Sequence, residues 1–141
     1  MANSQQISGI MKQVALAAVV DSKALKGALY LASATTNGSN SAYTATGELA
    51  ATGNYAAGGN TVTNGNTAGL TSTTAYWTPS ASIVWSNLTS SGAFDAVMIY
   101  STTDTNRNLG VFTFGSQSVT AGTFTLTMPT HDSSTGLIRF A

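Results

Sequence analysis

The chain has 141 residues, of which only 7% are charged, and five Lys and Arg balance five Asp and Glu. This length suits one domain with a buried core. Nucleic-acid binding needs clustered cations, so the composition argues against that partner. The absence of cysteine excludes disulfides and cysteine-ligated zinc. A nearly uncharged surface lacks the repulsion that keeps monomers apart, so we expect a homo-oligomer.

The first residues predict a helix or arm over residues 1–22. Asn3 or Ser4 would cap its start, and the β-branched pair before Asp21 favours an end near residues 19–22. Large apolar residues spaced three and four apart mark one helix face: Ile7, Ile10, Met11 and Val14. This face would pack either on the chain's own sheet or on a neighbouring molecule.

The same region holds the most apolar run of the chain, Val14–Val20, which follows Lys12. Its length is far below the roughly 20 residues of a membrane span. A cleaved signal peptide is not favoured, because no small-x-small site follows Val20 and Asp21 comes next. We therefore expect neither a signal peptide nor a membrane partner.

From residue 23 onward the apolar period changes to two, which is typical of β-strands. Polar Gly, Asn and Ser connectors separate about eight short candidates, and this spacing favours a single domain over residues 23–141, mainly β, an antiparallel β-sandwich or jelly roll. The candidate strands are Leu25–Ala32, Thr61–Thr63, Tyr76–Thr78, Ile83–Trp85, Phe94–Tyr100, Leu109–Phe114, Phe124–Met128 and Leu137–Phe140.

Three segments allow predictions about burial or order as well as about secondary structure. Phe94–Tyr100 is apolar on both faces after Asp95, as in a central strand. Alternation over Phe124–Met128 predicts a buried face formed by its three apolar residues, Phe124, Leu126 and Met128. Residues 34–74 are almost purely Thr, Asn, Gly, Ser and Ala with a few large apolar residues, which favours a long but ordered excursion.

The glycine-rich stretch "GELAATGNYAAGGNTV", residues 47–62, invites comparison with a phosphate-binding loop. Such a loop joins a strand to a helix and usually has a Lys aimed at the phosphates, and both features are missing here. A structural bend is favoured, in which Gly53, Gly58 and Gly59 allow positive φ or close backbone approach and Tyr55 packs inward.

Catalytic and metal-binding patterns are weak. His131 is the single histidine, in a turn-like segment where it would simply be solvated, and no nucleophile elbow accompanies it. The acidic residues lie in separate segments without a motif. Asp104–Asn108 has the first oxygen spacing of a calcium loop but lacks its glycine and final Glu, so a hairpin turn with Arg107 exposed is favoured. We expect no enzymatic activity, no metal and no cofactor.

Tyr76, Trp77 and Trp85 allow two interpretations. Amphipathic aromatics beside Asn and Thr suit a platform on which sugars stack. Their strand-like surroundings favour the alternative, in which they pack in the core or at an interface.

The order of segments resembles a family of small structural proteins of tailed bacteriophages. The resemblance covers most of residues 25–130 and rests on Leu29-Tyr30, Glu48 followed by the turn residues Gly53, Tyr55, Gly58 and Gly59, Trp85, Ala96–Tyr100, and Ala121–Leu126. It implies a virion part, variously a head decoration, cement or tail-fibre protein. The glycine run would then be a shared framework bend.

Two hypotheses follow. The first is a decoration or cement protein on the capsid surface, made in the host bacterial cytoplasm, that binds the major capsid protein and itself and stabilises the assembled head. The second is a tail or fibre module that binds host surface glycans. The residues proposed for an interface are Ile7, Ile10, Met11, Val14, Tyr55, Tyr76 and Trp77.

Overall fold

A computed structural model describes residues 3–141 and shows a mainly β protein with antiparallel sheets and one short helix near the N-terminus. The chain forms two compact units. The helix unit comprises residues 3–22, 64–80 and 128–141, and the sheet unit comprises residues 23–63 and 81–127. The predicted division into residues 1–22 and a single domain over residues 23–141 stays a prediction.

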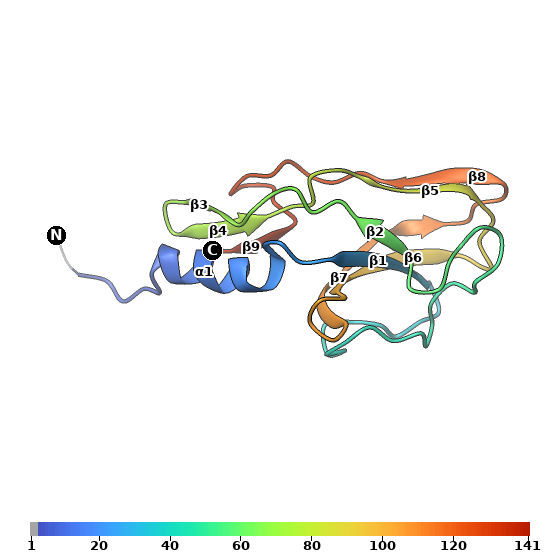
Figure 1. Ribbon diagram of the computed structural model, residues 1–141, viewed down its shortest axis with the longest axis horizontal. Helices are drawn as coiled ribbons and strands as arrows, with labels where there is room; N and C mark the ends of the chain where they lie inside the picture. Colours follow the sequence, from blue (N-terminus) through green and yellow to red (C-terminus); the bar gives the residue numbers. More distant parts are fainter. Residues whose placement is uncertain (1–2) are drawn as a thin grey trace. The chain divides into compact units, whose positions relative to one another are not determined.

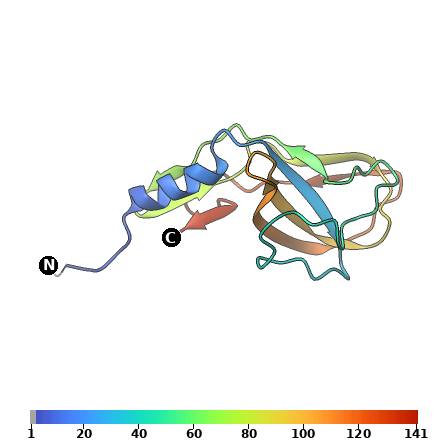
Figure 2. The same ribbon diagram turned by 60° about the horizontal axis from the view of Figure 1, so that its bottom comes forward.

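The helix unit consists of α1 (Gly9–Val20) packed on a three-stranded antiparallel sheet (Figure 1). The strand order is β3 (Gly69–Thr71), β4 (Thr74–Trp77) and β9 (Ile138–Phe140). Leu16 and Val20 of α1 are fully buried, as are Ala75 and Trp77 of β4. Figure 2 shows α1 in blue along the strands of its own unit.

The start of α1 differs from the prediction, whereas its end agrees. Neither Asn3 nor Ser4 caps the helix, because residues 3–8 are exposed and irregular and Ser8 occupies the cap position without a side-chain hydrogen bond. Gly9 allows this start: a Cβ there would lie 2.8 Å from the Ser72 carbonyl oxygen in the β3–β4 turn. The helix ends as predicted where Asp21 becomes extended.

The sheet unit contains a four-stranded and a two-stranded antiparallel sheet (Figures 1 and 2). The larger has the order β2 (Asn60–Val62), β1 (Leu25–Leu31), β6 (Phe94–Ser101) and β7 (Arg107–Gln117), and the smaller pairs β5 (Ile83–Leu88) with β8 (Gly122–Leu126).

The prediction of a central strand over Phe94–Tyr100 is confirmed, since β6 pairs with β1 on one side and β7 on the other. One face of this sheet carries a buried cluster of Ala28, Tyr30, Ala96, Met98 and Tyr100, against which Ala34 and Tyr43 pack. The polar segment after β1 thus covers that face and is ordered by it.

Two details of the strand predictions differ. The sequence does not predict β3, because Gly69–Thr71 contains only one large apolar residue. This segment becomes a strand because a tight turn with Ser72 at φ 54° brings it beside β4. The alternation in β8 is confirmed, but Phe124 and Leu126 are half-buried and Met128 lies beyond the strand.

The turn predictions are confirmed. Gly53, Gly58 and Gly59 adopt φ of 56°, 85° and 73°. Residues 102–106 join β6 to β7 in a hairpin with Arg107 exposed. Asp104 of this turn accepts a hydrogen bond from the Lys23 ammonium over 3.2 Å. This bond holds the pKa of the Asp104 carboxyl below its ordinary value.

Candidate functional site

The outward face of α1, together with Ile7 just before the helix, exposes apolar side chains. Ile7, Ile10, Met11 and Val14, the four residues proposed from the sequence, each expose 59–64% of their surface. Ala15 and Ala18 are exposed beside them. We call these six residues the outer stripe. The structure therefore brings together the four large residues predicted as an interface, and adds two alanines that the sequence pattern did not mark.

The inner side of the helix holds both of its polar side chains together with buried Leu16 and Val20, whereas its outer side is apolar throughout. Its only polar side chains, Lys12 and Gln13, turn toward the sheet, where they donate hydrogen bonds to the carbonyl oxygens of Thr73 (3.1 Å) and Ala68 (2.9 Å). A surface helix normally shows its polar face to water. Exposed apolar patches of this kind mark contact sites for other molecules.

The free energy gained by covering the outer stripe limits how tightly it can bind a partner. Complete burial of a Val, Ile or Met side chain contributes roughly 1.5–3 kcal/mol, so covering four that are about 60% exposed contributes roughly 4–7 kcal/mol. Association itself costs about 4–15 kcal/mol in lost freedom. The outer stripe alone therefore supports a weak contact, and a tight one needs reciprocal apolar surface or several contacts at once.

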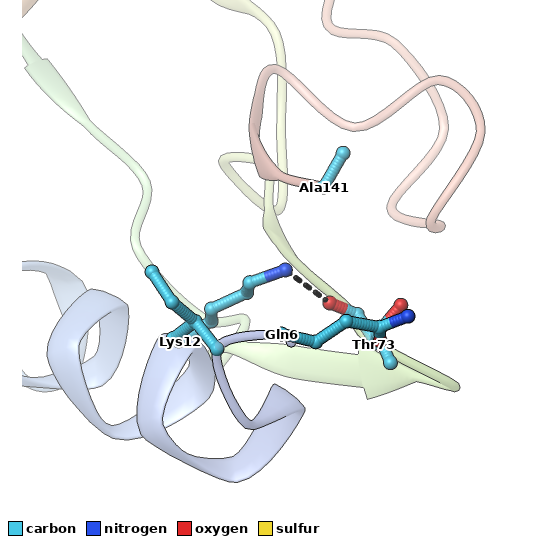
Figure 3. Close-up of a pocket in the computed structure, with 5 residues that line it drawn as sticks. Gln6, Lys12, Thr73 and Ala141 are labelled. Carbon is cyan, nitrogen blue, oxygen red and sulfur yellow. Dashed lines mark hydrogen bonds between the residues drawn. The ribbon is translucent and has the colours of Figure 1, made fainter. Parts of the chain in front are cut away.

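A hollow of about 380 Å³ lies at the start of the helix. Gln6, Ile7, Lys12, Thr73 and Ala141 line it. Figure 3 shows the Lys12 ammonium reaching across to the Thr73 carbonyl oxygen. Through Ile7 the hollow adjoins the outer stripe, so it extends the contact surface at the edge of the helix unit.

The other proposed interface residues are mostly covered. Trp77 is fully buried in the helix unit, and its indole N–H faces Asn64 Oδ1 at 3.2 Å. Tyr76 is half-buried in the same unit, edge-on to His131 with ring centres 5.0 Å apart. Tyr55 is buried in the sheet unit, which confirms that it packs inward. A sugar cannot stack on Trp77 in this conformation, nor on Trp85, which is buried in the sheet unit.

A buried carboxylate, Glu48, organises the glycine-rich bend. Its Oε1 accepts hydrogen bonds from the Tyr55 hydroxyl and the Gly58 N–H, both at 2.7 Å, and its Oε2 accepts one from the Tyr43 hydroxyl at 2.5 Å. The Tyr55 oxygen in turn accepts from the Leu29 N–H of β1 over 2.9 Å. The carboxylate therefore ties the bend to the central sheet.

The sequence places Glu48 and Tyr55 in the predicted framework bend, but its pattern does not indicate this network. The available signal was one acidic residue in a neutral, Gly-rich segment with a tyrosine on either side. Every Glu48 oxygen is occupied by a protein donor. The arrangement is structural.

Four of the five tyrosines adjoin this carboxylate, and all four have raised pKa values. Burial is the first cause in each case, followed by the hydrogen bond to Glu48 or its negative charge. The pKa of Tyr30 rises to about 12, and its hydroxyl donates to the Thr44 carbonyl oxygen over 2.5 Å.

These shifts predict loss of stability at alkaline pH. Unfolded tyrosines ionise near their ordinary pKa of 10, whereas the folded ones resist ionisation, so the stabilisation is complete below pH 10 and is lost as pH rises through the folded values. We expect the free energy of unfolding to fall between pH 10 and 12, and most tyrosinate absorbance to appear together with unfolding. Reversible ionisation of all five tyrosines near pH 10 in a folded chain would contradict this.

His131 is half-buried rather than merely solvated, and its Nδ1 accepts a hydrogen bond from the Thr78 N–H over 3.2 Å. Within residues 3–141, no three acidic or histidine side chains gather as a metal site would require. No helix in that range is long and apolar enough to cross a membrane.

The outer stripe is therefore the feature whose exposure calls for a functional explanation. Comparison of the chain with protein-family models, with curated proteins and with solved structures found no match.

Proposed function

We propose that the protein is a structural component of a tailed-bacteriophage virion, a decoration or cement protein that binds the major capsid protein at the capsid surface after synthesis in the host cytoplasm. One observation carries the proposal: α1 turns both of its polar side chains toward its own sheet and leaves the outer stripe exposed. Such a helix reaches its most stable state when another protein surface covers the outer stripe.

The role needs contact rather than chemistry. A protein that binds the assembled shell but not its free subunits stabilises the shell by mass action. Covering one outer stripe contributes too little free energy for tight binding by itself. Repetition over a symmetric shell converts such weak contacts into strong overall attachment. The near-neutral surface suits this role, because many copies can lie close together without repulsion.

The fold we propose for this role is a β-sandwich of jelly-roll type. Ring contacts between the two sheets of the sheet unit support it: Phe124 of β8 lies 5.0 Å from Phe94 of β6 and 5.5 Å from Phe114 of β7, between ring centres. Aromatic side chains between facing sheets are the usual core of such folds.

Cryo-electron microscopy of purified virions tests the proposal. The expected result is density of the size and fold of this chain, repeated over the icosahedral head. Density confined to the tail or neck would contradict decoration and would favour the fibre alternative, in which host glycans are the ligand. Absence of the chain from virions, checked by mass spectrometry of the same preparation, would overturn a virion role altogether.

A further inference from the structure

We propose that the outer stripe pairs with the outer stripe of a second copy of the chain, the two α1 helices running antiparallel about a two-fold axis that passes between residues 12 and 13. This inference rests on the outer stripe being a contact surface, as proposed above, and assigns it to a second copy of the chain, so that the major capsid protein would be bound by the paired chains rather than by the stripe itself. Four observations support a second copy rather than an unrelated partner.

The first observation is the spacing of the stripe. On α1 its central row is formed by Met11, Val14 and Ala18, whose intervals of three and four residues match the seam of a two-helix coiled coil. Ile7 lies four residues before Met11, in the irregular segment that precedes the helix. Ile10 and Ala15 flank this row on either side. A partner helix with the same spacing would interlock with it, and a second α1 has that spacing by definition.

The second observation is a gradient of side-chain size. The large residues lie toward the start of the helix and the alanines toward its end. In an antiparallel pair centred between residues 12 and 13, Ile10 lies opposite Ala15 and Met11 lies opposite Val14. Large Ile10 thus meets small Ala15, and the segment that carries Ile7 before the helix lies toward the Ala18 end of the partner helix.

Other pairings lack this fit. A parallel pair in register would set Ile10 against Ile10 and Ala15 against Ala15. The two isoleucines would then hold the helices apart at one end and leave a gap between the alanines at the other. Such a gap is unfavourable, because the atoms that line it lose their packing contacts.

The third observation is the electrostatics of the surface. The stripe contains no charged or hydrogen-bonding side chain. Lys12 lies near the axis in sequence, but its ammonium is bonded to the Thr73 carbonyl oxygen on the sheet side of the helix. Pairing two copies therefore brings no like charges together, and the stripe offers no charge pattern that would select a different partner.

The fourth observation is the area available. Each exposed large side chain contributes on the order of 100 Å² of apolar surface, so two stripes with their alanines bury roughly 1,000 Å². This area is below the roughly 1,200–2,000 Å² of stable specific interfaces and is typical of weak, transient contacts. The pair should therefore form reversibly, as suits a subunit that assembles at high local concentration.

Sedimentation equilibrium of the full chain tests the pairing. We expect a reversible dimer, weakened by roughly 100-fold or more in Val14→Glu, because an unpaired carboxylate would be buried in the apolar contact. Val84→Glu is the matched control: Val84 is another exposed valine, in β5, so the same added charge should leave the dimer unchanged. Circular dichroism checks that both variants fold. A wild-type chain that stays monomeric into the millimolar range overturns the proposal.

Cysteine cross-linking tests the orientation independently of charge. The chain has no cysteine, so introduced thiols report one position each. On oxidation, a mixture of Met11→Cys and Val14→Cys chains should give mainly the mixed disulfide, with little product from either variant alone. Equal cross-linking of Met11→Cys with itself overturns the antiparallel arrangement.

The outcomes separate this inference from virion decoration. A dimer that does not appear on the head retains the pairing and overturns decoration. A monomer that coats the head, and loses this binding in Val14→Glu, overturns the pairing and makes the shell the occupant of the stripe.

Discussion

Replacement of Gly59 by alanine is expected to destabilise the sheet unit by about 4 kcal/mol or more, a size reached only when the backbone itself must move. Gly59 adopts φ 73°, where a side chain adds roughly 1–2 kcal/mol of strain. A Cβ there would lie 1.9 Å from the Gly27 carbonyl oxygen and 2.7 Å from the Ala28 Cα, both in β1. These are backbone atoms, so no rotamer change relieves the overlap.

The matched control is Gly38→Ala, in the same polar excursion. A Cβ at Gly38 meets no atom within 4 Å, and we expect a change within about 0.5 kcal/mol. Urea denaturation followed by circular dichroism measures both variants. Equal stability of the two variants would show that the bend after Tyr55 does not approach β1 as described.

Replacement of Glu48 by alanine is the second large effect. It would leave the hydroxyls of Tyr43 and Tyr55 and the N–H of Gly58 without their acceptor. Hydrogen bonds to a charged group contribute about 1.5–3 kcal/mol each, and the three are not additive, so we expect a loss of about 4 kcal/mol. This is a large fraction of the roughly 5–15 kcal/mol that stabilises a typical domain.

Two milder variants separate the network from the volume of the side chain. Glu48→Gln keeps one oxygen as an acceptor and should lose about 1–2 kcal/mol, while Tyr43→Phe removes a single hydrogen bond and should lose about 1 kcal/mol. The same denaturation experiment ranks the three. Equal destabilisation by Glu48→Gln and Glu48→Ala would show that the lost free energy of unfolding comes from the charge of Glu48. The hydrogen-bond geometry would then contribute little.

The strands were predictable where apolar residues alternate or run together. Phe94–Tyr100 became the central strand because it is apolar on both faces, and the conformation of Gly58 and Gly59 followed from a bend that L-residues rarely adopt. β3 escaped prediction because its pairing comes from the turn at Ser72 rather than from hydrophobic pattern.

The sequence predicts which residues form one face of α1, but its periodicity does not indicate whether that face is buried or exposed. Both sides of this helix are apolar, with Leu16 and Val20 on one and Ile10 and Val14 on the other. Lys12 and Gln13 favour burial of the side with Leu16 and Val20, because their donors there bond the carbonyl oxygens of Thr73 and Ala68, beside β3 and β4.

The Glu48 network was hidden for a related reason. Tyr43, Tyr55 and Gly58 lie within ten residues of Glu48, but their donors converge only when the excursion folds back on β1. Local sequence indicates which residues can bond a carboxylate, whereas long-range folding decides which of them do.

The function proposed for the protein requires that the outer stripe be covered when the protein performs it. Oxidation of methionine by dilute peroxide, read by mass spectrometry, measures this directly. In dilute solution Met11 should oxidise quickly because 64% of it is exposed, while fully buried Met98 should resist and serve as the internal control. In intact virions Met11 should become as protected as Met98. Oxidation of Met11 in virions at its rate in the dilute chain would show that the outer stripe stays uncovered there.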